Sequence, residues 1–179
     1  GPLGVGIAKD LGLSHAEKGL MVATPVLAGA LLRIIMGILV DRLSPKKAAI
    51  IGQIVVIAAM TYAWLVGVHS YTEVLILGVF LGVAGSSFAA ALPLASRWYP
   101  AEHQGTAMGI AGAGNSGTAL AALFAPGLAA AFGWTNVFGI VLIPLVVVLI
   151  FFCFVAKDAP DAPPPKTLAE YLKVLKDKD

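Results

Sequence analysis

The segment AGAGNSGTALAALFAP, residues 111–126, lies inside an uncharged run that spans residues 104–156. A membrane-spanning helix needs about 20 mostly apolar residues, so this run is far longer than one crossing. The segment also carries three glycines around a single Asn115. Glycine weakens a helix by about 1 kcal/mol relative to alanine, and a buried amide costs free energy unless it is hydrogen-bonded. A compensating contact is therefore expected at this segment.

The composition of the whole chain is that of an integral membrane protein. Of its 179 residues, 59% are hydrophobic and 12% are charged, and the mean hydropathy is +0.90. No soluble domain of this size has such a composition. Several apolar stretches are long enough to cross a bilayer, and Arg33 is the charged residue that interrupts the first of them. They cover residues 19–40, 48–68, 74–96, 104–131 and 136–156. These stretches predict an all-α membrane protein with five complete crossings.

The basic residues between these stretches predict the orientation. Lys9 and Lys18 lie on one side of the membrane. The other side carries Arg42, Lys46, Lys47, Arg97, Lys157 and the lysines of the C-terminal tail. The positive-inside rule makes this second side cytoplasmic. We therefore expect a multi-pass membrane protein whose C-terminal tail is cytoplasmic.

Both ends of the chain differ from the spans. Residues 1–8, GPLGVGIA, are too short to cross and favour the end of a further helix, although GPLG alone would also fit the remnant of a purification tag. After the last span, DAPDAPPPK predicts a stiff linker. TLAEYLKVLKDKD then has a capping-box pattern at Thr167 and Glu170 and predicts a short amphipathic helix. The expected boundaries are a helix bundle over 1–157 and a cytoplasmic linker over 158–179.

Two of the expected spans carry polar side chains that need an explanation. On a helical projection of residues 105–126, small residues share one face with the amide. That face holds Met108, Ala111, Gly112, Asn115, Ala119, Ala122 and Pro126. It is expected to pack against another helix, because small residues let transmembrane backbones approach closely. The Asn115 amide then either hydrogen-bonds a neighbouring helix or, together with Gly112 and Gly114, contacts a small solute.

Arg33 lies several turns from either end of the 19–40 span, where a charge costs about 2.5–3.5 kcal/mol on insertion scales. Gly29 and Gly37 lie four residues away in each direction. An arginine facing lipid could extend its charge to the interface. A guanidinium in a protein-lined cavity would instead bind a planar oxyanion with two hydrogen bonds. No Asp or Glu lies in the middle of a predicted span, which favours an anionic ligand for Arg33.

Two stretches resemble a known family. GILVDRLSPKK, residues 37–47, resembles the loop motif between the second and third helices of the major facilitator superfamily, with Ser44 and Pro45 in place of the usual glycine and a basic residue. RWYPAEHQGTAMGIAGAGNSGTALAALFAP resembles the fourth-to-fifth helix region of the nitrate/nitrite porters within that superfamily, where a glycine-rich signature surrounds a central asparagine. The resemblance covers nearly the whole chain in order.

The resemblance implies the N-terminal six-helix half of a major facilitator fold, with helix one truncated. It also implies a secondary active transporter that moves nitrate or nitrite by alternating access between two six-helix halves. In such a site Arg33 binds the anion, Asn115, Gly112 and Gly114 belong to the signature, and Phe88 packs on the flat anion. The implied partners are nitrate or nitrite, membrane lipid and a second six-helix half.

The cytoplasmic motif has an implied gating role. By resemblance, Gly37, Asp41 and Arg42 belong to a latch that holds the two halves together on the cytoplasmic side. Asp41 closes one span and Arg97 ends another at the same face. The sequence therefore predicts an ion pair of Asp41 with Arg97 or with Arg42.

Other functions remain open at this stage. The protein could be a major facilitator porter for another small anion or an organic solute, or a helix bundle that transports nothing. An enzyme is disfavoured, because His15, His69 and His103 lie in loops of different segments and no metal-ligand spacing occurs. No basic face supports nucleic-acid binding. We expect neither a cofactor nor a metal.

Overall fold

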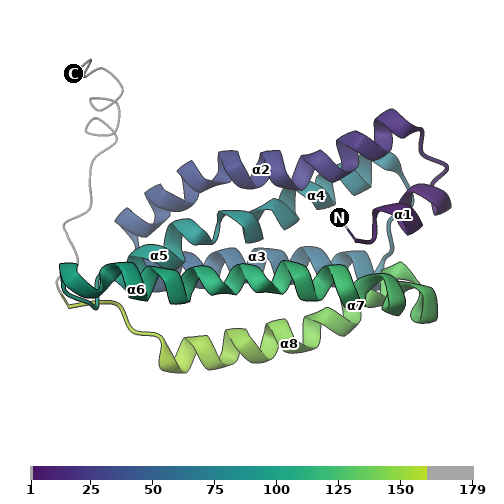
Figure 1. Ribbon diagram of the computed structural model, residues 1–179. Helices are drawn as coiled ribbons and strands as arrows, with labels where there is room; N and C mark the ends of the chain where they lie inside the picture. Colours follow the sequence, from purple (N-terminus) through teal and green to yellow (C-terminus); the bar gives the residue numbers. More distant parts are fainter. Residues whose placement is uncertain (1, 161–179) are drawn as a thin grey trace, which may run out of the picture.

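The computed structural model describes residues 2–160, so the amphipathic helix expected after Thr167 lies outside the described residues. The described part forms a bundle of long, roughly antiparallel helices (Figure 1). Its elements are α1 (Gly4–Asp10), α2 (His15–Arg42), α3 (Pro45–Leu65), α4 (Tyr71–Ser86), α5 (Phe88–Ser96), α6 (Ala101–Gly112), the 3-10 turn η1 (Ala113–Ser116), α7 (Gly117–Phe132) and α8 (Trp134–Val155).

The five expected crossings are confirmed. Helices long and apolar enough to span a membrane cover His15–Arg42, Pro45–Leu65, Tyr71–Ser96, Ala101–Phe132 and Trp134–Val155. Each agrees with its expected stretch to within about one helical turn. Two of them contain interruptions that the apolar pattern did not predict, one between α4 and α5 and one at η1.

Serine caps set where three of the spans begin. Ser14 and Glu17 form a complete capping box at the start of α2, with the Ser14 backbone N–H donating to the Glu17 carboxylate over 2.8 Å. Ser44 and Ser70 each accept a hydrogen bond from the third residue of the following helix. Such caps satisfy backbone donors that have no partner within the helix.

The interruption in the third span, Tyr71–Ser96, lies at Ser87. The hydroxyls of Ser86 and Ser87 donate to the carbonyls of Val83 and Ala84, over 2.7 and 2.6 Å. Such back-bonding competes with the regular helical ladder and bends helices, as do glycine–serine sequences such as the one here. The span therefore consists of two helices that meet near the middle of the bundle.

Glycines bring α2 and α4 into close contact. A Cβ added at Gly82 would lie 2.9 Å from the backbone nitrogen of Gly29, and one added at Gly29 would lie 2.9 Å from the carbonyl oxygen of Gly82. Neither position has room for a side chain. Gly78 and Gly82 form a GxxxG pattern, which is typical of close transmembrane helix pairs.

The buried core lies between α1, α2, α3, α4 and α8. Its larger cluster contains Ile7, Met21, Val56, Met60, Ala63, Val68, Val74, Leu77, Trp134, Phe138 and Leu142. The indole Nε1 of Trp134 donates to Asp10 over 2.6 Å and so ties the end of α1 to the start of α8. In contrast, no residue of α7 is buried by the described chain. The face of the bundle formed by α6, η1 and α7 is thus largely uncovered.

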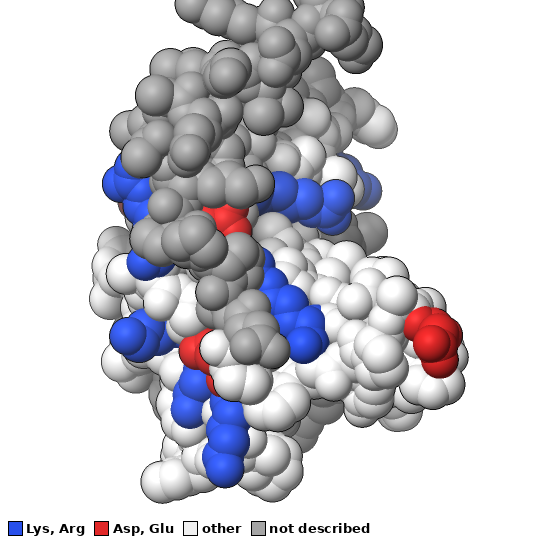
Figure 2. Space-filling view, turned by 90° about the vertical axis from the view of Figure 1, so that its left-hand side faces the viewer, with Lys and Arg blue, Asp and Glu red and all other residues white. Residues whose placement is uncertain are grey.

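Basic side chains gather at one end of the bundle. Figure 2 views the end where α2, α5 and α8 finish and α3 and α6 begin, and it shows mostly lysine and arginine among the charged residues. The described residues there include Arg42, Lys46, Lys47, Arg97 and Lys157. This agrees with the cytoplasmic orientation expected from the sequence.

Candidate functional site: an intramembrane arginine and a cytoplasmic ion pair

Arg33 lies in the middle of α2, beside the point where α4 gives way to α5. Its Nε donates a long hydrogen bond of 3.4 Å to the carbonyl oxygen of Gly85. The rest of the guanidinium makes no hydrogen bond or ion pair with another described residue. The side chain is exposed in this part of the protein. Its terminal nitrogens are therefore available as paired donors for an anion.

The acidic residues that the structure describes lie away from Arg33. They are Asp10, Glu17, Asp41, Glu73, Glu102 and Asp158, each in a loop or within a turn or two of a helix end. Arg33 thus has no carboxylate partner within residues 2–160. An intramembrane cation in this situation is a candidate anion-binding residue.

The two glycines that flank Arg33 on α2 have different environments. Gly29 is buried against the α4 backbone, so it serves helix packing and does not clear space for a ligand. At Gly37 an added Cβ would meet nothing within 4 Å. Of these two glycines, only Gly37 therefore has open space beside it.

Phe88 starts α5 directly after the break at Ser87 and is half-buried. Gly85, whose carbonyl Arg33 contacts, precedes it by three residues, so the two share one side of the chain. The packing of α2 on the α4–α5 junction thus brings Arg33 and Phe88 into the same region. The contact with Gly85 is the observation behind this grouping.

Asn115 lies in η1, where the fourth span, Ala101–Phe132, changes from α-helix to a 3-10 turn. Three weak helix formers, Gly112, Gly114 and Gly117, surround this turn. The Thr118 hydroxyl donates to the Asn115 carbonyl and supports the tighter turn. The Asn115 side chain is exposed and makes no hydrogen bond within the described range. The structure therefore does not use it as a hydrogen bond between two described helices.

The glycines next to Asn115 are not in a close helix contact within residues 2–160. A Cβ added at Gly112 or at Gly114 would meet nothing within 4 Å. The expectation that this small face packs on a neighbouring helix is thus not met by the described chain, whose close glycine contact lies between α2 and α4 instead. The GxxxG pattern at Gly78 and Gly82 was the signal that could have located it.

An ion pair links two spans at the basic end of the bundle, the end that the sequence predicts to be cytoplasmic. Arg97 Nη2 lies 3.8 Å from Asp41 Oδ1, with the side chains 24% and 29% exposed. This is one of the two pairings expected from the sequence. Because α2 ends at Arg42 and α5 ends at Ser96, the pair joins the ends of two adjacent helices.

The same end holds contacts that the sequence did not reveal. The Lys46 backbone N–H donates to Asp158 over 2.9 Å, and Lys46 Nζ donates to the Cys153 carbonyl over 2.8 Å. The Trp98 indole donates to the Lys157 carbonyl over 3.0 Å. These contacts fix the first residues after α8 on the ends of α3 and α5.

The fold defines a class: a helical membrane protein with five candidate spans among its described residues. The Major Facilitator Superfamily family model matches residues 1–178. The chain therefore belongs to the Major Facilitator Superfamily.

Curated relatives agree with the subfamily resemblance. The chain is 39% identical over 163 residues to "Probable nitrate/nitrite transporter NarK2" of Mycobacterium tuberculosis, covering 89% of this chain and 41% of that protein. It is 35% identical to "Nitrite extrusion protein" of Bacillus subtilis, covering 79% and 35% of the two chains. It is also 35% identical to "Probable nitrate/nitrite antiporter NarK1" of Thermus thermophilus, covering 73% and 29%.

The chain is shorter than these relatives. It spans about two fifths or less of the length of each of the three. Their names are those of transporters and not of enzymes, which agrees with the expectation from the sequence. All three come from bacteria, and the described helices are those of a multi-pass membrane protein.

Proposed function

We propose that the complete protein containing this chain is a secondary active transporter of nitrate or nitrite, which works by alternating access. Arg33 carries the proposal. It is a permanently charged, fork-shaped donor in mid-span, held by a single backbone carbonyl and without a carboxylate partner in residues 2–160. Nitrate and nitrite are planar oxyanions, which suit the two parallel hydrogen bonds of a guanidinium. The names of the curated relatives support the same substrates.

The remaining site residues follow from their positions. Phe88 would pack on the flat face of the anion, because it starts α5 three residues after Gly85, whose carbonyl Arg33 contacts. Asn115, Gly112 and Gly114 would contribute from the middle of another span, through an amide that makes no hydrogen bond within residues 2–160 and through open backbone. A second six-helix half, beyond this chain, would complete the site and provide the other part of the alternating-access movement.

Exchange of one anion for another is the favoured mode of transport. Proton symport would need a titratable carrier, and mid-span positions in residues 2–160 hold no carboxylate. One relative is named an antiporter, which supports exchange.

Counterflow in proteoliposomes tests the proposal. Purified full-length protein is reconstituted into vesicles loaded with unlabelled nitrite or nitrate, and uptake of labelled nitrate is followed. We expect uptake that depends on the internal anion and is inhibited by nitrite but not by chloride. Uptake driven equally by an unrelated anion or an organic solute would assign the protein to another porter type. No uptake with any solute would favour a bundle without transport activity.

A further inference from the structure

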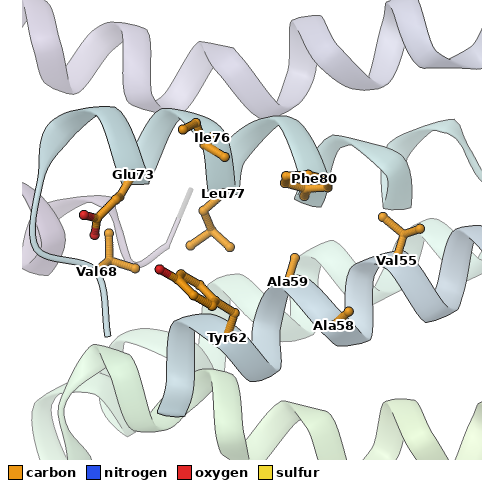
Figure 3. Close-up of a pocket in the computed structure, with 9 residues that line it drawn as sticks. All are labelled: Val55, Ala58, Ala59, Tyr62, Val68, Glu73, Ile76, Leu77 and Phe80. Carbon is orange, nitrogen blue, oxygen red and sulfur yellow. The ribbon is translucent and has the colours of Figure 1, made fainter. Parts of the chain in front are cut away.

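A groove on the bundle surface carries an inference that is separate from the anion site. It lies between α3 and α4 near their non-cytoplasmic ends and has a volume of about 470 Å³ (Figure 3). Its walls are almost entirely apolar, and the residues that line it on α3 include the small Ala58 and Ala59. The small alanines create the hollow, since larger neighbours on both helices stand around them.

The groove is open along its length. Tyr62, Ile76 and Phe80 border it and are 54%, 52% and 46% exposed, so no described residue covers them. Both bordering helices are membrane spans. An open apolar groove on such helices is expected to bind acyl chains of membrane lipids.

One end of the groove is polar. Glu73 lies there, in the first turn of α4, and the Tyr62 hydroxyl points toward the same end (Figure 3). One Glu73 oxygen, Oε2, accepts a hydrogen bond from the His69 backbone N–H over 2.8 Å. The Ser70 hydroxyl and backbone N–H also interact with this carboxylate. An ionised carboxylate has about four acceptor positions, so Glu73 can accept one more donor at the rim of the apolar groove.

The groove is short enough to lie within one leaflet. Glu73 and Phe80 are seven residues apart, which is about 10 Å along a helix at 1.5 Å per residue. One leaflet contributes about 15 Å of the hydrocarbon core of a bilayer. The groove therefore runs from the headgroup level into the outer leaflet, given the cytoplasmic position of the opposite end.

We propose that this groove binds a phospholipid with a primary-amine headgroup, such as phosphatidylethanolamine. The acyl chain lies along Ala58, Ala59 and Phe80, and the ammonium group donates a hydrogen bond to the Glu73 carboxylate. A primary ammonium carries three N–H donors and pairs with a carboxylate by a charge-assisted hydrogen bond. A choline headgroup has the same charge but no N–H, so it makes the weaker contact.

Native mass spectrometry of the full-length protein tests the proposal. The protein is mixed with phosphatidylethanolamine or phosphatidylcholine of identical acyl chains, and the retained lipid is counted. We expect wild-type protein to favour the amine lipid by about fivefold, the upper range for an exposed ion pair. Glu73→Gln keeps an oxygen for the His69 N–H but loses the charge, and it should abolish that preference.

Further variants distinguish lipid binding in the groove from lipid binding elsewhere on the protein. Glu17→Gln changes the corresponding first-turn carboxylate of α2, which lies outside the groove, and should retain the wild-type preference. Ala59→Phe, with Ala58→Leu as a milder replacement, fills the groove and should reduce the binding of both lipids. An unchanged preference in Glu73→Gln, or unchanged lipid retention in both groove-filling variants of confirmed helix content, would overturn the proposal. Equal retention of the two lipids by the wild type would do the same.

Discussion

At the scale of single residues, the environment of Arg33 determines what the chain can bind. Its Nε is fixed by the Gly85 carbonyl, and this contact orients the guanidinium while leaving its terminal nitrogens available. A charge in mid-span is unfavourable by about 2.5–3.5 kcal/mol, so binding an anion recovers part of that free energy. The sequence identified Arg33 by its position in the middle of a predicted span and by the absence of Asp and Glu from the middle of the predicted spans. It could not identify Gly85 as the contact, because that depends on how α2 packs on α4.

Asn115 provides a test at the same scale. Its side chain makes no hydrogen bond within the described part of the chain, so its removal breaks no contact seen here. We expect Asn115→Ala to lower nitrate transport by about tenfold, the effect of one lost hydrogen bond to a charged ligand. Expression and melting temperature should stay near wild-type values. The measurements are proteoliposome uptake and thermal unfolding in detergent; a lower melting temperature with normal uptake would instead assign Asn115 a structural role.

At the scale of the elements, the lengths of the apolar stretches predicted the spans. They did not predict the two interruptions within spans. The break at Ser87 arises from hydroxyl groups that bond to carbonyls one turn back. The 3-10 turn at Asn115 arises where glycines weaken the helix. A count of apolar residues does not register either effect. Both interruptions lie in mid-span and carry or adjoin candidate ligands, and a 3-10 stretch within a helix is often a functional hinge.

The glycine contact between α2 and α4 gives a prediction for this scale. Gly82→Ala would place a methyl group 2.9 Å from the Gly29 nitrogen, so the two backbones must separate. We expect a destabilisation of about 1–3 kcal/mol, the range for overpacked sites, and a lower melting temperature of the purified protein.

Gly19→Ala is the matched control, because it lies on α2 and its added Cβ would meet nothing within 4 Å. It should be neutral or stabilising by up to about 1 kcal/mol, since alanine is the better helix former. If both variants lost stability equally, the loss would not reflect the helix contact.

At the scale of the whole molecule, the cytoplasmic end combines the Asp41–Arg97 pair with the attachment of the residues after α8. An exposed ion pair contributes about 0–1 kcal/mol, which is little for stability. A shift of about 1.4 kcal/mol, however, changes a conformational equilibrium tenfold. We infer that the pair acts by selecting the state that is closed on the cytoplasmic side. The sequence predicted the pair from antiparallel spans, but it could not predict the Lys46–Asp158 contact, which depends on the path of the chain after α8.

Asp41→Asn tests this gating role. We expect nitrate affinity within about twofold of wild type, slower turnover, and a population shifted up to about tenfold toward the form open to the cytoplasm. The shift is measured by labelling a single cysteine introduced in the 41–47 loop. Glu102→Gln is the control, because it removes a carboxylate at the same end that has no ion pair among the described residues. Identical labelling of wild type and Asp41→Asn would exclude the gate.

The central claim is that Arg33 binds the transported anion through its planar fork. The most direct test is the equilibrium affinity of the purified full-length protein for nitrate, with Arg33→Lys beside wild type and Arg42→Lys as a control at the cytoplasmic end. Lysine keeps the charge but loses the paired donors. We predict that Arg33→Lys folds and weakens nitrate binding by about tenfold or more, the value of one to two charge-assisted hydrogen bonds, while Arg42→Lys binds normally. Wild-type affinity in a folded Arg33→Lys protein would contradict the account.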